Sequence, residues 1–190
     1  NAPELLPLDN LDAIVLTHAH VDHIAMLPVL FRYGYRGPVY CTPPTRDLMT
    51  LLQMDYIKVS QAEGADPPYS KADIQECIKH VVDIRWGDKT DIAPDVKITL
   101  ENAGHILGSS SVYMQIGEGN SEHRLLFSGD IKYERSWLFD AATVRFQKVE
   151  TLVIESTYGG AQDFQPNRAD ATQELQDLVK LALSRGGKIF

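Results

Sequence analysis

The chain has 190 residues, of which 44% are hydrophobic and 23% are charged, a size and balance typical of one globular domain with a sizeable core. This composition excludes a disordered protein, and the longest apolar runs are too short to cross a bilayer. The formal net charge of −8 argues against a surface that attracts nucleic acid everywhere. It does not exclude a nucleic-acid substrate, because bound metal ions can supply local positive charge.

The first part of the sequence alternates short apolar strands with helices. The expected elements are a strand at 12–17, a loop at 18–26, a helix from about Pro28 to Gly34, a strand at 37–42, and helices at 43–64 and 70–80. Pro28 suits the first position of a helix, and Gly34 can end it. Ser70 and Asp73 have the spacing of a capping box, which predicts the start of the last of these helices.

The remaining sequence predicts mostly strands, followed by one helix. The expected elements are strands at 82–86, 96–103, 110–117, 123–129 and 151–156, a hairpin loop at 117–122, and a helix at 167–187. Asn167 and Gly186 are suited to the start and the end of that helix. Strands and helices are mixed throughout, which indicates an α/β class with mixed sheets.

The ends and the cysteines bear on the type of protein. The chain starts at Asn1 without a methionine, and GGKIF at 186–190 is typical of a strand that has just begun. We therefore expect a piece of a longer protein.

Cys41 and Cys77 form no CxxC pair, so we expect two buried, reduced thiols and a cytoplasmic protein with no membrane association.

Four potential metal ligands lie in the sequence HAHVDH at 18–23, directly after the first predicted strand. Imidazole nitrogen binds zinc well, and a carboxylate adds an oxygen ligand. Because neighbouring loop positions point in different directions, the four cannot all converge on one tetrahedral ion. The natural division places His18 with His20 on one metal and Asp22 with His23 on another, and two adjacent metals can clamp an attacking and a leaving oxygen.

Further residues of the same chemical types follow other predicted strands. His105 lies between a strand and a glycine-rich turn, and Asp130 directly follows an apolar strand. A carboxylate has two oxygens and can span two cations, so Asp130 is the candidate bridging ligand. Glu155 ends another apolar strand, where a carboxylate beside a turn and a role in proton transfer or in orienting a ligand are both open. The other two histidines are His80 and His123, which lie in charged, polar segments. Both are expected to be solvated, and neither is assigned a role.

Together these residues resemble the metallo-β-lactamase superfamily. The run at 18–23 is similar to its second motif, His105 to its third and Asp130 to its fourth, in the expected order. ESTYGG at 155–160 resembles motif A of the β-CASP branch, whose members process RNA or DNA. Two longer stretches resemble the archaeal relatives of the cleavage and polyadenylation specificity factor nuclease: 31–61 and 104–116.

The resemblance implies a site with two zinc ions. The implied ligands are His18, His20 and His105 for the first zinc, Asp22 and His23 for the second, and Asp130 as the bridge between them. Asp22 and Glu155 are the implied catalytic residues, with Glu155 as the motif A acid near the metals.

The implied fold is the four-layer αββα sandwich, present here in part. The metallo-β-lactamase domain is expected to cover residues 1–187, and the inserted β-CASP domain is expected to begin at 188–190. By resemblance, an acidic first motif would lie before Asn1, and the motif B and motif C histidines would lie beyond Phe190. The second zinc then lacks one protein ligand, so this segment alone is not expected to be a competent enzyme.

The main functional hypothesis is a zinc-dependent ribonuclease of RNA 3′-end processing or transcription termination, acting as an endonuclease or a 5′→3′ exonuclease. Water activated by metal coordination would attack the scissile phosphorus in line and leave a 5′-phosphate and a 3′-hydroxyl. DNA stays open as a substrate. The alternatives are an RNase J-like RNA-decay nuclease, a small-molecule metallohydrolase of the same fold and a non-catalytic scaffold. The expected partners are RNA, transcription or RNA-processing machinery and, for the full-length protein, a second copy in a homodimer.

Overall fold

The computed structural model describes residues 8–189, without the side chains at positions 9 and 120. The chain divides into two compact units, Asn1–Glu155 and Ser156–Phe190. Residues 1–7 and 190, which belong to the two predicted domain ranges, lie outside the described residues. The predicted domain boundary between 187 and 188 stays a prediction.

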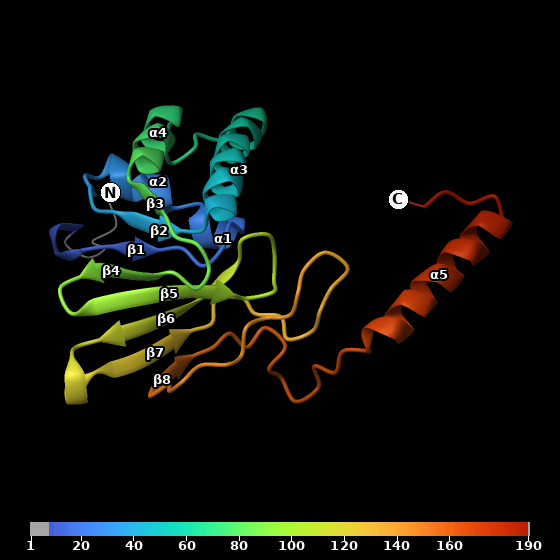
Figure 1. Ribbon diagram of the computed structural model, residues 1–190. Coiled ribbons are helices and arrows are strands. Elements are labelled where there is room, and N and C mark those ends of the chain that lie inside the picture. The colour runs from blue at the N-terminus through green and yellow to red at the C-terminus, as the bar shows by residue number, and fades with distance from the viewer. Residues whose placement is uncertain (1–7, 190) are drawn as a thin grey trace. The chain divides into compact units, whose positions relative to one another are not determined.

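Two β-sheets form the centre of the first unit (Figure 1). The smaller sheet is parallel, in the order β1 (Ile14–Val15), β2 (Val39–Cys41) and β3 (Val81–Asp83). The larger sheet has the order β4 (Lys89–Ala93), β5 (Val96–Asn102), β6 (Ser110–Ile116), β7 (His123–Phe127) and β8 (Thr151–Val153). Its strands β4 to β7 pair antiparallel, and β8 pairs parallel with β7.

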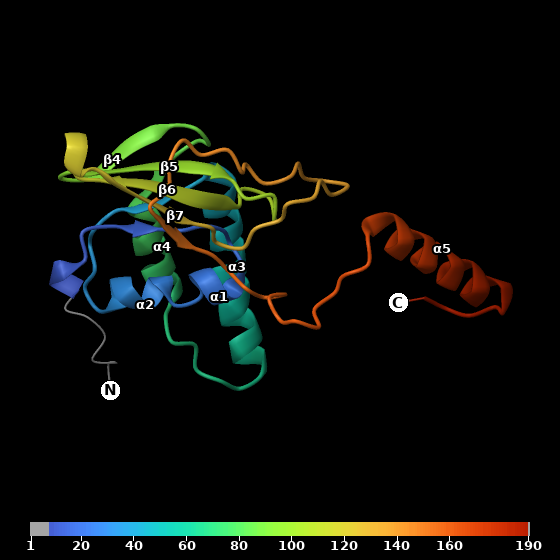
Figure 2. The ribbon, with the colours of Figure 1, turned by 90° about the horizontal axis from the view of Figure 1, so that it is seen from below.

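Helices cover the parallel sheet on the side away from the larger sheet, as Figures 1 and 2 show. They are α1 (Val21–Ile24), α2 (Leu27–Arg32), α3 (Pro43–Ala62) and α4 (Lys71–Lys79), with short 3₁₀ turns at Leu8–Asn10 and Gly119–Ser121. The alternation of strand side chains explains the layers. In β2, Val39 and Cys41 join the apolar cluster under the helices, whereas Tyr40 joins Ile98 and Leu100 in the cluster between the sheets.

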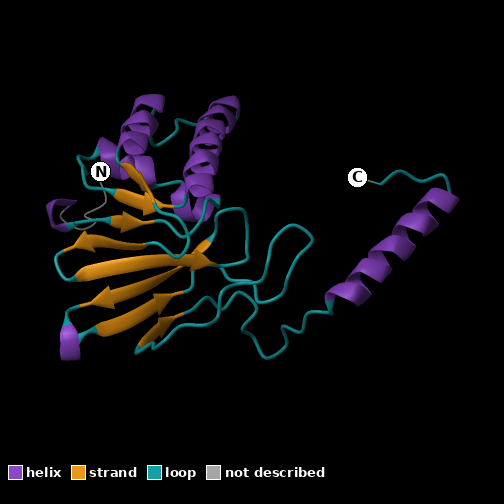
Figure 3. Cartoon of the chain, in the orientation of Figure 1, coloured by secondary structure: helices purple, strands orange, loops and turns teal. Residues whose placement is uncertain are grey.

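This arrangement confirms the predicted α/β class and a partial metallo-β-lactamase sandwich. The first unit shows a helix layer, the parallel sheet and the mixed sheet, which are three of the four expected layers (Figure 3). Among its described residues, no α-helix covers the outer face of the larger sheet. The capping box that predicts α4 is present, because Ser70 Oγ accepts a hydrogen bond from Asp73 N and Asp73 Oδ2 accepts one from Ser70 N.

Several predicted element bounds are wrong. The expected loop 18–26 contains α1, whose four residues are too few for helical periodicity to be visible. Strand β4 is absent from the sequence prediction, since KTDIA at 89–93 carries exposed charged positions. The strand expected at 82–86 is β3, one residue earlier and two residues shorter. The strand expected at 151–156 ends at Val153, because the chain then turns toward the loop after β7.

Two features bear on the predicted type of protein. Cys41 and Cys77 are both free and buried, as predicted, and burial raises the pKa of each thiol to about 12. Within the described residues, none of the helices combines the length and the apolar composition that a bilayer span requires.

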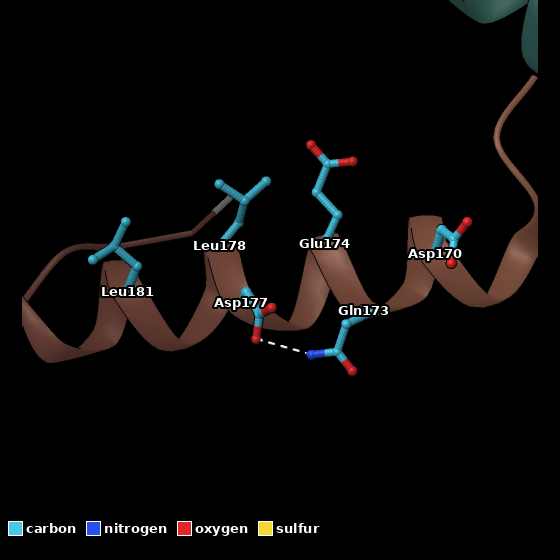
Figure 4. Close-up of a pocket in the computed structure, with 6 residues that line it drawn as sticks. All are labelled: Asp170, Gln173, Glu174, Asp177, Leu178 and Leu181. Carbon is cyan, nitrogen blue, oxygen red and sulfur yellow. Dashed lines mark hydrogen bonds between the residues drawn. The ribbon is translucent and has the colours of Figure 1, made fainter.

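The second unit consists of a loop and the helix α5 (Arg168–Ser184). Asn167 caps this helix as predicted, because its Oδ1 accepts a hydrogen bond from Asp170 N at 2.9 Å. Figure 4 shows one face of α5, on which Gln173 Nε2 donates to Asp177 Oδ1 beside the exposed leucines at 178 and 181.

Candidate metal centre

Strand topology brings the predicted ligands to one edge of the two sheets. His18 and His20 lie between β1 and α1, His105 follows β5, and Asp130 follows β7. The carboxyl ends of β5 and β7 lie at the same edge, because both pair with the first residues of β6. Ser110, the first residue of β6, donates its N–H to the carbonyl of Thr17 at 2.7 Å, which joins the two sheets beside His18.

Three imidazoles and one carboxylate converge there. The ligand atoms of His18, His20, His105 and Asp130 all lie within 4.8 Å of one another. His20 Nδ1 lies 3.0 Å from the Nε2 atoms of both His18 and His105. Asp130 Oδ2 lies 3.5 Å from the same two Nε2 atoms. The structure therefore brings these four predicted residues together.

The donor set and its spacing fit a zinc ion. A tetrahedral zinc with bonds of about 2.0–2.1 Å places its ligand atoms about 3.3 Å apart. Four of the six distances within this group are 3.0 or 3.5 Å, close to that value. Three nitrogens and one oxygen are also ligand types that zinc accepts.

The second predicted ligand group lies against the other oxygen of Asp130. His23 Nε2 lies 3.6 Å from Asp130 Oδ1 and 3.4 Å from Asp22 Oδ2. Asp130 thus presents Oδ2 to His18 and His105 and presents Oδ1 to His23. Each oxygen faces one of the two groups, which is the arrangement that a bridging carboxylate requires.

The buried histidine of the first group is held in its neutral form. His18 is fully buried, and desolvation, followed by the positive charge that His23 would carry, lowers its pKa to about 3. Desolvation also lowers the pKa of His105. Neutral imidazole is the form that binds a metal, so burial prepares these side chains for coordination.

The depressed pKa of His18 predicts how the stability of the metal-free protein depends on pH. Between the ordinary pKa of 6.5 and the folded value of about 3, the unfolded chain binds a proton that the folded chain does not. Stability is therefore fully present above pH 6.5 and falls as the pH drops, by up to about 1.4 kcal/mol per pH unit from this group. Denaturant unfolding of the metal-free protein at several pH values between 6.5 and 4 measures the slope.

The matched variants for this measurement are His18→Gln and His123→Gln. His18→Gln should reduce the slope, whereas His123→Gln should leave it unchanged because His123 is exposed. An equal slope in His18→Gln and in the wild type would show that another group carries the pH dependence.

Two further side chains contact the cluster residues or the backbone next to them. Thr17 Oγ1 lies 3.1 Å from His18 Nδ1, on the far side of the ring from the cluster. Glu155 Oε1 accepts a hydrogen bond from the backbone N–H of Ile131 at 2.8 Å, directly beside Asp130. The roles left open for Glu155 stay predictions. The sequence prediction missed Thr17, although a hydroxyl next to the first histidine of the run was a usable signal.

The remaining histidines lie outside this cluster. His123 is exposed, with Nε2 2.9 Å from Thr151 Oγ1. His80 is half-buried rather than solvated as predicted, because its ring packs against Phe31 and its Nδ1 lies 2.9 Å from the carbonyl oxygen of Glu76.

Comparison with known proteins agrees with the fold and the residue pattern. Residues 2–184 match the family model described as a beta-lactamase superfamily domain. The chain is 51% identical over 190 residues to the transcription termination factor FttA of Methanothermobacter thermautotrophicus, and 51% identical over 190 residues to that of Methanocaldococcus jannaschii. It is 52% identical over 181 residues, or 95% of its length, to that of Thermococcus kodakarensis.

The first two matches include the whole of this chain but only 29% and 30% of the relatives, and the third includes 28% of its relative. The chain therefore spans under a third of the length of these proteins. The family model matches almost the entire chain, and the relatives are archaeal, as the resemblance implied. The chain belongs to the metallo-β-lactamase superfamily.

Proposed function

We propose that the protein is a zinc-dependent ribonuclease whose metal centre is built from His18, His20, Asp22, His23, His105 and Asp130. The observation that carries this proposal is the position of Asp130. Its Oδ2 lies 3.5 Å from two imidazole nitrogens, and its Oδ1 lies 3.6 Å from a third. A carboxylate shared in this way supports two adjacent cations, the arrangement suited to in-line displacement at phosphorus.

Each side chain of the centre has a defined task in this proposal. Two zinc ions bound here would supply an acidic water as nucleophile and positive charge to offset the phosphate oxygens. His18, His20 and His105 present ring nitrogens to one another, and Asp22 presents an exposed carboxylate beside His23. Glu155 keeps Asp130 in place through the N–H of Ile131. Protonation of the leaving 3′-oxygen is assigned to the region around Glu155.

The choice of RNA rests on the relatives. They are named transcription termination factors, and ESTYGG at 155–160 resembles motif A of the β-CASP branch. We propose RNA 3′-end formation during transcription termination as the role of the full-length protein, in the cytoplasm, as a homodimer and with the transcription machinery as partner. The β-CASP domain would begin at 188–190 and would supply the missing ligand of the second zinc.

Metal removal from the full-length protein tests this function. The purified protein is incubated with a 5′-labelled RNA before treatment with a chelator, after treatment, and after zinc is restored. Cleavage should disappear with the metal and return with zinc, leaving a 5′-phosphate and a 3′-hydroxyl on the products. A DNA of the same sequence serves as the matched substrate.

The other outcomes separate the alternatives. Cleavage that survives complete metal removal contradicts the proposal. A protein that binds zinc and hydrolyses a thioester or a lactam but not RNA is a small-molecule hydrolase. A protein that binds no zinc and cleaves nothing is a scaffold.

A further inference from the structure

The loop that carries His105 is held from within by a serine. Ser109 Oγ accepts hydrogen bonds from the backbone N–H groups of both His105 and Ile106, each at 3.1 Å. Ser109 is completely buried, so no water competes for these bonds. The backbone at His105 is therefore fixed relative to Ser109, at the other end of the loop, and this fixes the direction of the His105 side chain.

The same loop is also held by Thr42, the N-cap residue of α3, and by Thr45 in the first turn of that helix. The Thr42 hydroxyl donates to the carbonyl oxygen of Gly108 at 2.7 Å. Thr45 Oγ1 lies within reach of both that oxygen, at 3.1 Å, and Thr42 Oγ1, at 2.9 Å. Thr42 and Thr45 are buried. The Ser110 hydroxyl also donates to this carbonyl, at 3.2 Å. Hydroxyl groups from separate segments therefore converge on one buried oxygen, and the loss of any of them weakens the pairing of a buried polar group.

Gly108 lies so close to the helix that no side chain fits there. A Cβ atom at this position would lie 2.7 Å from Thr42 Oγ1, 2.9 Å from Pro44 Cβ and 3.0 Å from Thr45 N. Its φ of +78° is also a conformation that favours glycine. Backbone and helix therefore touch directly, three residues after His105.

We propose that Thr45 is a positioning residue of the metal centre, acting with Thr42 to fix His105 through the Gly108 carbonyl. Thr45 touches no ligand atom. Its hydroxyl helps to fix the position of the loop at 105–109, and the loop fixes the position of the His105 side chain. His105 Nε2 lies 3.0 Å from His20 Nδ1. This inference rests on the proposed metal function and adds a determinant of metal affinity that lies in a helix.

Zinc affinity of the full-length protein tests the inference. Thr45→Val keeps the shape of the side chain and removes the hydroxyl, and Thr45→Ser keeps the hydroxyl. We expect Thr45→Val to bind zinc about 10-fold more weakly, as is typical when a group that orients a ligand is lost. Thr45→Ser should keep the wild-type affinity. Competition with a chromophoric chelator measures the dissociation constant, and the visible spectrum of the cobalt(II) form reports the ligand geometry.

The matched control is Thr50→Val in the same helix. Thr50 Oγ1 donates to the carbonyl of Arg46 at 2.9 Å, a bond within the helix, so its loss should leave zinc affinity and the cobalt spectrum unchanged. Circular dichroism of the metal-free variants gives the folded fraction, to which the affinities are normalised. If Thr45→Val does not fold, Thr45→Ala, which also removes the hydroxyl, takes its place with the same expectation.

Two results would overturn the inference while leaving the proposed function intact. One is a Thr45→Val protein with wild-type zinc affinity and cobalt spectrum. The other is an equal loss of affinity in Thr50→Val, which would indicate a general effect of the helix. A wild-type protein that binds no zinc would instead overturn the proposed function.

Discussion

Replacement of Asp130 by asparagine in the full-length protein is expected to abolish RNA cleavage. The substitution keeps the size of the side chain but removes its charge and replaces one ligand oxygen with an amide nitrogen that does not coordinate. Asp130 presents one oxygen to each ligand group. Asparagine would therefore leave one of the two proposed metals without this ligand and would remove the negative charge shared between them. Loss of a group that only orients a ligand costs about 10–100-fold in metal affinity or activity, so we expect at least about 100-fold here. Zinc content by mass spectrometry and cleavage of a labelled RNA measure the two effects.

The control for this substitution is Asp140→Asn. Asp140 is exposed, and within the part of the chain that the structure describes its carboxylate pairs with the exposed Arg135, at 3.4 Å. This variant should therefore keep its zinc and its cleavage rate. Asp130→Asn with full zinc content and an undiminished rate would remove the basis of the proposed function.

Replacement of Gly129 by alanine is expected to destabilise the fold beside the centre strongly. Gly129 has a φ of +57°, and a Cβ there would lie 2.8 Å from Thr17 Cβ and 3.2 Å from the carbonyl oxygen of Ser110. The left-handed backbone costs alanine about 1–2 kcal/mol, and the crowding adds about 1–3 kcal/mol. We therefore expect the free energy of unfolding to fall by about 2–5 kcal/mol, as measured by denaturant titration.

Gly119→Ala separates the two contributions. Gly119 has the same φ of +57°, but nothing lies within 4 Å of a Cβ at that position. Only the backbone term remains, so the expected loss is about 1–2 kcal/mol. Equal losses in the two variants would show that the contact with Thr17 does not matter, and that the backbone conformation alone requires glycine at 129.

The sequence predicted which side chains gather at the candidate centre better than it predicted the contacts that hold them in place. HAHVDH at 18–23, His105 and Asp130 each follow a predicted strand, and strand ends are where side chains from separate segments meet. The hydroxyls of Thr42 and Thr45 could not be predicted in this way. Their partner, Gly108, lies more than 60 positions further along the chain, and no local pattern records a contact between a helix and a distant loop.

The same distinction explains the errors in the fold prediction. The long helix α3 was predicted closely because prolines mark its start and its apolar spacing continues over many residues. Helix α1 was missed because a single turn has no periodicity. Strand β4 was missed because pairing with β5, rather than its own charged sequence, determines its conformation.

The joint origin of the ligands in both sheets has a consequence for how metal and folding are linked. In the unfolded chain, His18 and Asp130 are separated by more than 100 residues, and closing such a loop is costly in entropy. In the folded chain the loop is already closed, because the hydrogen bond from Ser110 N–H to the Thr17 carbonyl joins the sheets beside the site. Metal binding to the folded chain therefore involves no further loss of loop entropy. A metal that binds only the folded form at 100 times its dissociation constant adds about 2.7 kcal/mol to stability. An ion bound at this site would therefore act as a removable cross-link between the two sheets.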